Sequence, residues 1–567
     1  MEKRWLFKEN PVTEIESLSH DLGVSPVVAG MLWRRELRDI DAARSFFNPT
    51  LEQLHDPFEM KDMELAVTII GERLKRGRPI MVLGDYDVDG TTAASILHLY
   101  LQSLGIATTV YIPDREREGY GVSTAAIEKA RELGIDLIIT CDCGITALKA
   151  TALARSHEID MIITDHHIPG PELPQARAIL NPKQADCAYP NKNLCGAGVA
   201  FKLVQGLCLS QDIAMDKAYE LLDLAAIGTA ADLVPVVGEN RVIVHEGLTQ
   251  IASSRRPGIH ALKEVAGIRK ERVQVSDIVF GLAPRINAVG RLGEASRAVH
   301  LLTAPDLSQA TTYSRVLNSE NENRKEIESG IVDEAIRLAN AKYDPREKRG
   351  LVLYREGWHH GVIGIVASKL KERYWVPVVL IAVNDGLGKA SARSLEGFDM
   401  YSALAQCADL LESFGGHTMA AGLTINPENL EAFEERFLEL TASLVDDEMM
   451  QPRVHIEAEI EFADVNLQLM ETLRRLAPYG PGNMRPVFAT RGLQPTGHPR
   501  IVGGNHLKFK LKQGRRVLDA IGFGMAESFE TLVGGHLVDC AYVLTENEWQ
   551  GRKTIQLEVK DLRPAEQ

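Results

Sequence analysis

Between residues 80 and 164, strand-like apolar runs alternate with helix-like stretches. The strand-like runs cover 80–83, 108–112, 136–140 and 161–164, and the helix-like stretches between them cover 92–104, 123–133 and 145–156. The run at 80–83 has no polar alternation, as is typical of a strand covered on both faces. This alternation predicts an α/β fold with a doubly wound, mainly parallel sheet. The active site of such a sheet lies beyond the carboxyl ends of its strands.

Acidic and imidazole side chains follow three of these runs and one later apolar helical run. They are Asp85, Asp87 and Asp89 after 80–83, Asp142 after 136–140, Asp165, His166 and His167 after 161–164, and Asp232 after 221–227. Singly, each could be a helix cap or a solvated turn. Their recurrence at one end of one sheet favours a divalent-metal site. Mixed Asp and His ligands without cysteine suit Mn²⁺ or Mg²⁺ better than structural zinc.

Asp85, Asp87 and Asp89 follow one another at two-residue spacing and end on Gly90. If this segment is extended, all three carboxylates point to one side. Three like charges so close repel one another, and a divalent cation would relieve the repulsion. The alternative is a polar turn with an aspartate near a helix N-terminus, which needs no metal.

Composition excludes some classes of protein. The 567 residues suggest roughly three or four domains. No apolar run is long enough to span a bilayer, and the N-terminal MEKRWLFKENPVTEIE lacks a signal-peptide core, so we expect no membrane association. Seven cysteines, an odd number, predict no disulfide framework and fit a reduced, cytoplasmic location; Cys141 and Cys143 alone are weak evidence for zinc. The net charge of −15 still permits nucleic-acid binding in a local groove.

Changes of pattern along the chain suggest its division. The stretch that begins at residue 307 is polar on most faces, which is typical of a helix that bridges domains through solvent. From about residue 450 the pattern changes to short alternating strands. We therefore expect a helical N-terminal segment at 1–45, a catalytic domain at 46–306, a connecting helix at 307–347, a second α/β domain at 348–446 and a C-terminal β-barrel at 450–567.

The segment HLKFKLKQG, from residue 506, alternates apolar and basic side chains. On a strand, one face would be apolar and the other would carry Lys508, Lys510 and Lys512. Six Lys or Arg and no Asp or Glu lie between Thr496 and Arg516. This pattern favours an OB-fold barrel wall that follows a phosphate backbone. The alternative is an edge strand that lysines protect from aggregation.

Basic residues near the predicted catalytic sheet are candidates for phosphate contacts. Arg115 and Arg117 could form a fork for a phosphate, because guanidinium geometry matches paired phosphate oxygens. The alternative is a solvated loop in which Glu116 and Glu118 pair locally with these arginines. Three further candidates stand in APRINAVGR, which contains no acidic residue: Arg285, Asn287 and Arg291.

The second α/β domain contains further candidates for anion binding. Ser391 and Arg393, in KASARS, are expected to form an anion-binding pair on a strand. Gly415 and Gly416, with His417, are expected to precede a helix, where free backbone N–H groups could meet a phosphate. Each glycine segment could equally be a tight turn.

The motifs resemble those of a known superfamily. DYDVDG, TCDCG, the Asp-His-His tripeptide and GTAADLVPV look like the four motifs of the DHH phosphoesterases. Over nearly the whole chain, the ordered set is similar to the bacterial single-strand-specific 5′→3′ DNA exonucleases of that superfamily. The motifs that extend the likeness are APRINAVGR, GWHHGVIGIVASKL, SARS, GGHTMAAG and PYGPGNMRPVF.

The resemblance implies a site with two metal ions, Mn²⁺ or Mg²⁺. Asp87 and Asp89 match the aspartates most often used as ligands, and Asp85 is less certain. Asp142 would bridge the ions, and Asp232 would complete the second. His166 would belong to the metal site with Asp165, and His167 would lie on the ligand or substrate side, where the three could serve catalysis.

The resemblance also implies a substrate and partners. The enzyme would shorten single-stranded DNA from its 5′ end, release nucleoside 5′-monophosphates and serve DNA repair and recombination. Ser391 and Arg393 would meet the 5′-phosphate. A single-strand-binding protein and a helicase are possible partners of what we expect to be a monomer.

Two other functions stay open at this point. A DHH phosphoesterase for short oligonucleotides, cyclic dinucleotides or pyrophosphate would not need a basic C-terminal barrel. A non-catalytic DNA-binding factor could keep the fold, but it would not need to retain the carboxylates, all of which are present here.

Overall fold

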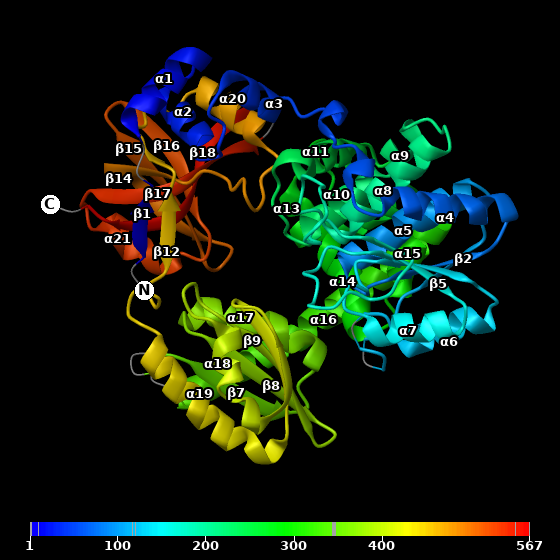
Figure 1. Cartoon of the computed structure of the whole chain (residues 1–567). Helices are drawn as coiled ribbons and strands as arrows, with labels where there is room; N and C mark the ends of the chain where they lie inside the picture. Colours follow the sequence, from blue (N-terminus) through cyan, green and yellow to red (C-terminus); the bar gives the residue numbers. More distant parts are fainter. Residues whose placement is uncertain are drawn as a thin grey trace. The chain divides into compact units, whose positions relative to one another are not determined.

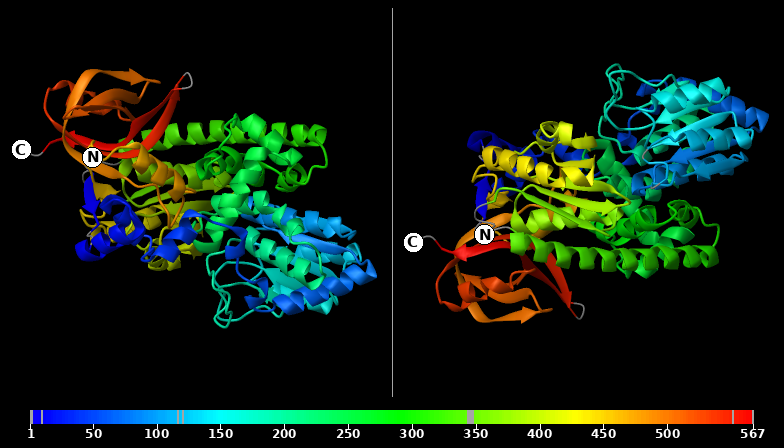
Figure 2. Two further views of the ribbon diagram at one scale, coloured as in Figure 1. Left: turned by 90° about the horizontal axis from the view of Figure 1, so that it is seen from above. Right: turned by 90° about the horizontal axis from the view of Figure 1, so that it is seen from below.

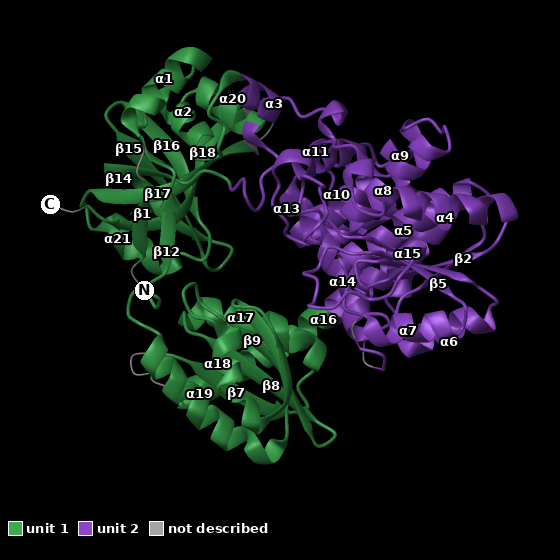
Figure 3. Cartoon of the chain, viewed as in Figure 1, with its two compact units in different colours: residues 1–40, 324–475, 485–567 green, residues 41–323, 476–484 purple. Residues whose placement is uncertain are grey.

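The computed structural model describes residues 3–8, 11–115, 117–119, 121–342, 348–549 and 552–565. The chain divides into two compact units (Figure 3). Unit 1 consists of residues 1–40, 324–475 and 485–567, and unit 2 consists of residues 41–323 and 476–484. The chain therefore passes from one unit to the other four times. Among the described residues, no helix is both long and apolar enough to cross a bilayer.

Unit 2 contains a parallel five-stranded sheet, which confirms the predicted α/β fold. Its order is β3 (Thr108–Tyr111), β2 (Ile80–Gly84), β4 (Leu137–Cys141), β5 (Asp160–Thr164) and β6 (Ala178–Leu180). All positions of β2 and β4 are buried. Gly84 is level with Cys141, and Cys141 with Thr164. The segments that leave these three strands therefore start side by side.

Helices cover both faces of this sheet, so it is doubly wound (Figure 1). Ile80 and Val82 pack in one core with α4 (Met63–Arg76), α5 (Val88–Ser103) and α8 (Gly196–Ser210). Met81 and Leu83 pack on the opposite face with α6 (Thr124–Glu132) and α7 (Leu148–Ser156). The other helices of unit 2 are α9 (Asp216–Tyr219), α10 (Leu222–Ala231), α11 (Gly238–Ser253), α12 (Pro257–Ala266), α13 (Val275–Asp277), α14 (Ala283–Leu292) and α15 (Ser296–Leu302).

A single 36-residue helix, α16 (Leu307–Lys342), connects the units, as predicted for this polar stretch. It is the long green helix of Figure 2. The boundary between units 2 and 1 falls within it, between residues 323 and 324.

The second α/β domain has a mixed five-stranded sheet in the order β10 (Leu411–Gly416), β11 (Ala420–Ile425), β9 (Leu387–Arg393), β8 (Val378–Asn384) and β7 (Leu351–Glu356). Its helices are α17 (His360–Tyr374), α18 (Met400–Ala405) and α19 (Leu430–Leu444). The expectation that Gly415 and Gly416 precede a helix is wrong. Gly415 pairs with Gly422, and Gly416 with Ala421, in an antiparallel hairpin. Pairing with the next strand therefore makes this segment a strand and not the start of a helix.

The C-terminal region forms a barrel of β14 (Phe488–Val502), β15 (His506–Gln513), β16 (Arg516–Gly522), β18 (Arg552–Pro564) and β17 (Val538–Trp549), which pairing of β17 with β14 closes. The remaining elements of this region are β12 (Arg453–Ile456), β13 (Ala458–Glu459), α20 (Leu467–Leu476) and α21 (Phe529–Val533). This confirms the predicted barrel.

The N-terminal segment contains α1 (Val12–Leu22), α2 (Pro26–Trp33) and α3 (Ile40–Phe47), and also a strand that the sequence did not predict. This strand, β1 (Arg4–Phe7), pairs in parallel with β12. Trp5 is buried against Val454, Ile456 and Ala541, and its Nε1 donates to Asp561 at 2.7 Å. The first residues of the chain are thus part of the C-terminal core.

Candidate metal centre

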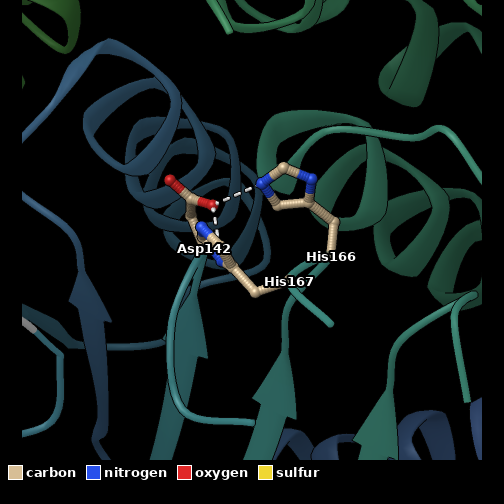
Figure 4. A group of neighbouring side chains, drawn as sticks. All are labelled: Asp142, His166 and His167. Atoms are coloured by element: carbon tan, nitrogen blue, oxygen red, sulfur yellow. Dashed lines mark ion pairs between the residues drawn. The ribbon is translucent and has the colours of Figure 1, made fainter. Parts of the chain in front are cut away.

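The segments that follow β2, β4 and β5, together with the end of α10, bring the predicted acidic and imidazole residues together. Three groups, each with ligand atoms within 4.8 Å of one another, are Asp85, Asp87 and Asp142; Asp89, His166 and Asp232; and Asp142, His166 and His167. Asp142 and His166 each belong to two of these groups, so together they connect all three. In Figure 4 the rings of His166 and His167 both lie against the Asp142 carboxylate. The predicted residues therefore converge as the strand ends suggested.

The segment from Asp85 to Asp89 does not stay extended, so the three carboxylates are not aligned by strand geometry. Asp87 is the N-cap of α5 and accepts a hydrogen bond from the Gly90 N–H at 3.0 Å, so Asp89 lies in the first helical turn. A β-carbon at residue 90 would lie 2.5 Å from the Asp85 carbonyl oxygen, which explains the glycine. The helix cap and a cluster of candidate ligands were considered as alternatives, but the structure contains both the cap and the cluster of side chains.

A second helix start, which the sequence reasoning missed, holds Asp89. The carboxylate of Asp89 accepts hydrogen bonds from the N–H groups of Gly196 and Ala197, at 2.5 and 2.8 Å, at the N-terminus of α8. A β-carbon at residue 196 would lie 2.4 Å from the Asp142 β-carbon. The signal was available in CGAGVAF, a glycine-rich start to an apolar helix, because helix N-termini favour anions.

Asp142 is held in an uncommon backbone conformation. Its φ of 62° lies in the left-handed region, which costs energy for a residue with a β-carbon. Its N–H donates to the Thr164 carbonyl at 2.9 Å, which ties it to the end of β5. Its Oδ1 lies 3.0 Å from Nε2 of His166. Strain at this position is consistent with a carboxylate placed for function.

Asp165 orients the two histidines and belongs to none of the three ligand groups. It accepts hydrogen bonds from the N–H groups of Ile145 and His166, at 2.9 and 2.7 Å, and interacts with Nδ1 of His167 at 2.8 Å. These bonds, the one with His167 foremost, hold the pKa of Asp165 below its ordinary value although burial alone would raise it. Asp165 therefore holds the His167 ring in its orientation.

The electrostatics of the cluster call for a cation. Burial, and then repulsion by Asp87, raises the pKa of Asp85 to about 7, and burial with Asp89 raises that of Asp232 to about 8. The pKa of Asp142 is raised well above its ordinary value for the same reasons. Burial, and then His167, lowers the pKa of His166 to about 4, which leaves its ring neutral and able to bind a metal.

Three buried atoms support the fit of a metal ion. Oδ1 of Asp85, Oδ1 of Asp142 and Nδ1 of His166 are buried without a hydrogen-bond partner. Buried polar atoms normally have a partner, so these exceptions need an explanation, and a bound cation is one. The donors are oxygen and nitrogen, which suit Mn²⁺ and Mg²⁺. Cys141 and Cys143 are free thiols that pack in opposite cores of the sheet, away from such a role.

Arg115 lies beside the metal cluster. Its guanidinium is 5.2 Å from the ring of Tyr86, between Asp85 and Asp87 in the chain. Glu118 accepts hydrogen bonds from Tyr111 and from the Asp114 N–H, at 2.8 and 2.9 Å. Glu118 thus forms hydrogen bonds close to its own position in the chain. Glu116 lies outside the described residues. Arg117 donates its backbone N–H to Asp114 at 3.1 Å.

The three candidates of APRINAVGR lie on α14. Arg285 donates to the carbonyls of Gly281 and Val265 and to Asn318, at 2.7, 3.1 and 2.9 Å. Asn287 accepts from the Val88 N–H at 3.2 Å, so it supports the start of α5. Arg291 lies in the last turn of α14. The structure thus gives Arg285 and Asn287 local hydrogen bonds, and their contact with a phosphate stays a prediction.

Ser391 and Arg393 lie together on β9 next to α17. Arg393 donates to the hydroxyls of Ser391 and Ser368 at 2.9 and 3.1 Å, and burial lowers its pKa. No described carboxylate lies within 4.0 Å of its nitrogens, so this half-buried guanidinium has charge to offer an anion. His417 lies in the turn between β10 and β11, where its N–H donates to the Ala420 carbonyl at 2.8 Å.

The lysines of β15 face outward while Leu507, Phe509 and Leu511 are buried, as the alternation predicted. β15 pairs with β14 on one side and β16 on the other. It is therefore not an edge strand, and protection of an edge does not explain Lys508, Lys510 and Lys512. Lys510 forms an ion pair with Asp519 at 3.1 Å.

Family models match three parts of the chain. The DHH family N-terminal domain matches residues 79–229, the DHHA1 domain matches 347–443 and the RecJ OB domain matches 456–561. The fold and the acidic site therefore define a DHH-family protein with an OB domain.

Relatives along the whole chain make the assignment more specific. The chain is 37% identical to the single-stranded-DNA-specific exonuclease RecJ of Bacillus subtilis (99% of this chain, 71% of the relative) and 37% identical to that of Escherichia coli (89% and 91%). Crystal structures of RecJ from Thermus thermophilus with Mn²⁺ and with Mg²⁺ match with TM-scores of 0.85 and 0.78, at 31% and 30% identity. Both matches cover 100% of this chain and 80% or 79% of the other. The chain belongs to the RecJ family.

Proposed function

We propose that this protein is a metal-dependent exonuclease that shortens single-stranded DNA from its 5′ end and releases nucleoside 5′-monophosphates. The observation that carries the proposal is the cluster of buried carboxylates around Asp142 with three buried polar atoms that form no hydrogen bond. The named activity of its RecJ relatives supports the substrate. The polarity and the product are our inference from the sequence resemblance.

Two cations, Mn²⁺ or Mg²⁺, would be held by the carboxylates and by His166. One ion would be held by Asp85, Asp87 and Asp142, and the other by Asp89, His166 and Asp232. When bound, such ions polarise the phosphodiester and lower the pKa of an attacking water. Asp85, given the least weight from sequence, is as well placed as Asp87, because its Oδ1 is buried and lacks a partner.

His167 would act on the substrate side of the site. Its side chain is 44% exposed, whereas that of His166 is 8% exposed. Asp165 raises the pKa of His167 against the effect of burial, so the ring keeps a proton to higher pH. With Nδ1 held by Asp165, the ring would donate from Nε2 to a non-bridging phosphate oxygen. Each of the three residues would thus have one role: Asp165 would position His167, His166 would bind metal, and His167 would donate a proton.

Other basic residues would bind the rest of the DNA. Ser391 and Arg393 would bind the 5′-phosphate, because a guanidinium held by two hydroxyls is preorganised for an anion. His417 would also lie near the 5′ end of the bound DNA. The remaining contacts to phosphates would come from Arg115, Arg117, Arg285, Asn287, Arg291, Lys508, Lys510 and Lys512.

We further propose a place for the enzyme in the cell. It would act as a monomer in the cytoplasm, in DNA repair and recombination. A helicase would supply its single strands, and a single-strand-binding protein would present them.

One experiment tests metal dependence, polarity and strand preference together. Single strands labelled at the 5′ or the 3′ end are incubated with Mn²⁺, Mg²⁺ or EDTA, with duplex DNA as control. We expect 5′-labelled strands to release labelled mononucleotide at once, 3′-labelled strands to shorten progressively, and EDTA to stop both. Mononucleotide released first from the 3′ end would refute the polarity.

A further inference from the structure

Residues 476–484 (LAPYGPGNM) belong to unit 2, although the chain on both sides of them belongs to unit 1. We call this segment the clasp. Asn483, which is 1% exposed, closes it: its Nδ2 donates to the carbonyls of Leu476 and Pro478 at 2.8 and 2.9 Å. Gly480 and Asn483 also exchange backbone hydrogen bonds at 3.1 and 2.9 Å. The clasp therefore has a fixed shape of its own.

Arg241 of α11 fastens the clasp to unit 2. The residue is 2% exposed, and it donates to the carbonyls of Leu476, Ala477 and Pro478 at 2.9, 2.8 and 3.3 Å. Its Nε donates to the Phe46 carbonyl at 3.0 Å. A buried guanidinium is costly unless its N–H groups are hydrogen-bonded. The clasp supplies acceptors that α11 cannot provide for itself.

The other end of the clasp contacts the loop that carries Asp232. The Val236 N–H donates to the Pro481 carbonyl at 2.7 Å, and Val236 is 1% exposed. A β-carbon at residue 480 would lie 2.5 Å from Cγ2 of Val236, and one at residue 482 would lie 3.2 Å from Cβ of Pro235. Both glycines therefore permit a close approach of the clasp to this loop.

The loop needs such support because its backbone is strained. Leu233, directly after Asp232, has a φ of 59°, and its side chain is 57% exposed, so packing of that side chain does not hold the conformation. Strained residues persist only where their surroundings enforce them. Here Asn240 donates to the Pro235 carbonyl at 3.0 Å, and the clasp holds Val236. Asp232 lies at one end of the loop, and these contacts fix the other end.

We propose that the clasp is a positioning element for Asp232: it holds the strained loop so that the Asp232 carboxylate stays close to Asp89 and His166. The inference rests on the proposed function, because it takes Asp232 as a metal ligand. Nε2 of His166 lies 3.7 Å from Oδ2 of Asp232, so a small shift of the loop would break up this group of three ligands. Gly480 and Arg241 would act through Asp232 as positioning residues.

The test uses the full-length Gly480→Ala protein, whose new methyl group would push on Val236. Gly330→Ala is the matched control, because no heavy atom lies within 4 Å of that β-carbon. Binding of Mn²⁺ is measured by electron paramagnetic resonance without DNA, and kcat and KM for single-stranded DNA are measured over a range of Mn²⁺ concentrations. We expect one Mn²⁺ to bind about tenfold more weakly in Gly480→Ala. The kcat should recover at high Mn²⁺, and the KM for DNA should not change.

Arg241→Lys provides a second variant in case Gly480→Ala does not fold. It keeps the charge but loses the fork that reaches three carbonyls, and we expect the same weakening of one Mn²⁺ site. Variants that melt at lower temperature but bind Mn²⁺ like the wild type would show a merely structural clasp and overturn the proposal. A wild-type protein that bound no Mn²⁺ would instead refute the proposed function on which the inference rests.

Discussion

The metal centre and the lysine face of β15 both present charge to a substrate, but they are built differently. In the metal centre the carboxylates are packed against one another, and Asp89 and Asp165 are fixed by backbone N–H groups. On β15 the apolar side chains are buried, whereas Lys508 and Lys510 are exposed and Lys512 is partly exposed. Only the backbone of this strand is fixed, and its lysine side chains are long and flexible.

This difference in structure predicts how each region responds to substitution of its charged residues. Buried like charges raise one another's pKa, so the metal centre acts as a unit and depends on every member. Exposed lysines act on a phosphate backbone almost independently, and each adds a small contribution that salt screens. We therefore expect large, non-additive effects in the first region and small, additive effects in the second.

The largest effect is expected from Asp142→Ala, because Asp142 joins the ligand groups. Hydrolysis of single-stranded DNA should fall to the background of a blank reaction, and so should that of Asp89→Ala. The metal-free Asp142→Ala protein should melt no lower than the wild type, because loss of one buried carboxylate relieves repulsion of the others. Turnover and melting temperature are measured on the same samples.

Asp223→Ala is the matched control for this prediction. Asp223 is also buried, but it pairs with Arg256 at 2.8 Å, away from the site. Its loss should lower the melting temperature and leave turnover intact. Near-normal turnover of Asp142→Ala would break the proposed assignment of metal ligands.

A large effect on stability is expected when EDTA removes metal. The pKa values of Asp85 and Asp232, about 7 and about 8, lie above the ordinary 3.8, so the folded chain binds protons more tightly than the unfolded chain. The stability from this source is fully present below about pH 3.8 and is lost as pH rises to about 8. In EDTA, wild type should lose stability relative to Asp232→Asn over this window, by roughly 1.4 kcal/mol per pH unit for a single group.

Calorimetry in EDTA and in Mn²⁺ checks this prediction. Mn²⁺ should stabilise the wild type most at the alkaline end of the window, because the metal replaces the protons that the carboxylates have released. The opposite outcome would be a wild type that becomes more stable than Asp232→Asn as pH rises in EDTA. That result would show that the pKa of Asp232 is not raised in the folded protein.

An intermediate effect is expected from Arg393→Gln, because Arg393 is half-buried but lies outside the metal centre. Loss of a charged hydrogen bond to the 5′-phosphate should reduce kcat/KM on 5′-phosphorylated strands roughly ten- to a hundredfold. Strands with a 5′-hydroxyl should be cut equally well by both proteins. The exposed Arg373→Gln on α17 is the control. Equal losses on both substrates would exclude a contact with the 5′-phosphate.

The smallest effects are expected on β15. Changing Lys508, Lys510 and Lys512 together to Gln should weaken DNA binding and flatten its salt dependence by about two to three phosphate contacts, at roughly 0.7 in slope for each on a single strand. Lys510 should contribute least, because Asp519 already neutralises it. Binding is measured by fluorescence anisotropy over a salt series, with Lys75→Gln on α4 as control. An unchanged slope would show that these lysines do not meet phosphates.

Local sequence predicted the parallel sheet and most of the site, because both depend on short-range features. An apolar run fixes a buried strand, and parallel register then brings the residues after each strand together. Asp142 and His166 were placed in this way without any knowledge of contacts, whereas Asp232 follows the helix α10 and was assigned to the site from its motif. The start of α5 at Val88 was not, because the two-residue spacing of the aspartates is compatible with a strand and with a capped helix.

The features that sequence reasoning missed depend on contacts between distant segments. Gly196 reaches Asp89 across 107 positions, and β1 finds its partner β12 near the other end of the chain. The hairpin of Gly415 and Gly416 is an exception, because its partner β11 is the next strand along the chain. Contacts between distant segments leave only weak signals in the local sequence, such as a glycine with no evident local reason. The periodicity of apolar residues does not show which distant segments will meet.

The clasp changes how this protein can be divided into parts. A truncated chain that ends near residue 450 would be the obvious way to ask what the barrel contributes. It would also lack the nine residues 476–484, so Arg241 would lose the three carbonyl acceptors of the clasp and Val236 would lose the Pro481 carbonyl. Loss of activity in that fragment would then be read as loss of DNA binding, although its cause lay at Asp232. A fair dissection keeps the clasp, and the catalytic part is therefore a discontinuous piece of the chain.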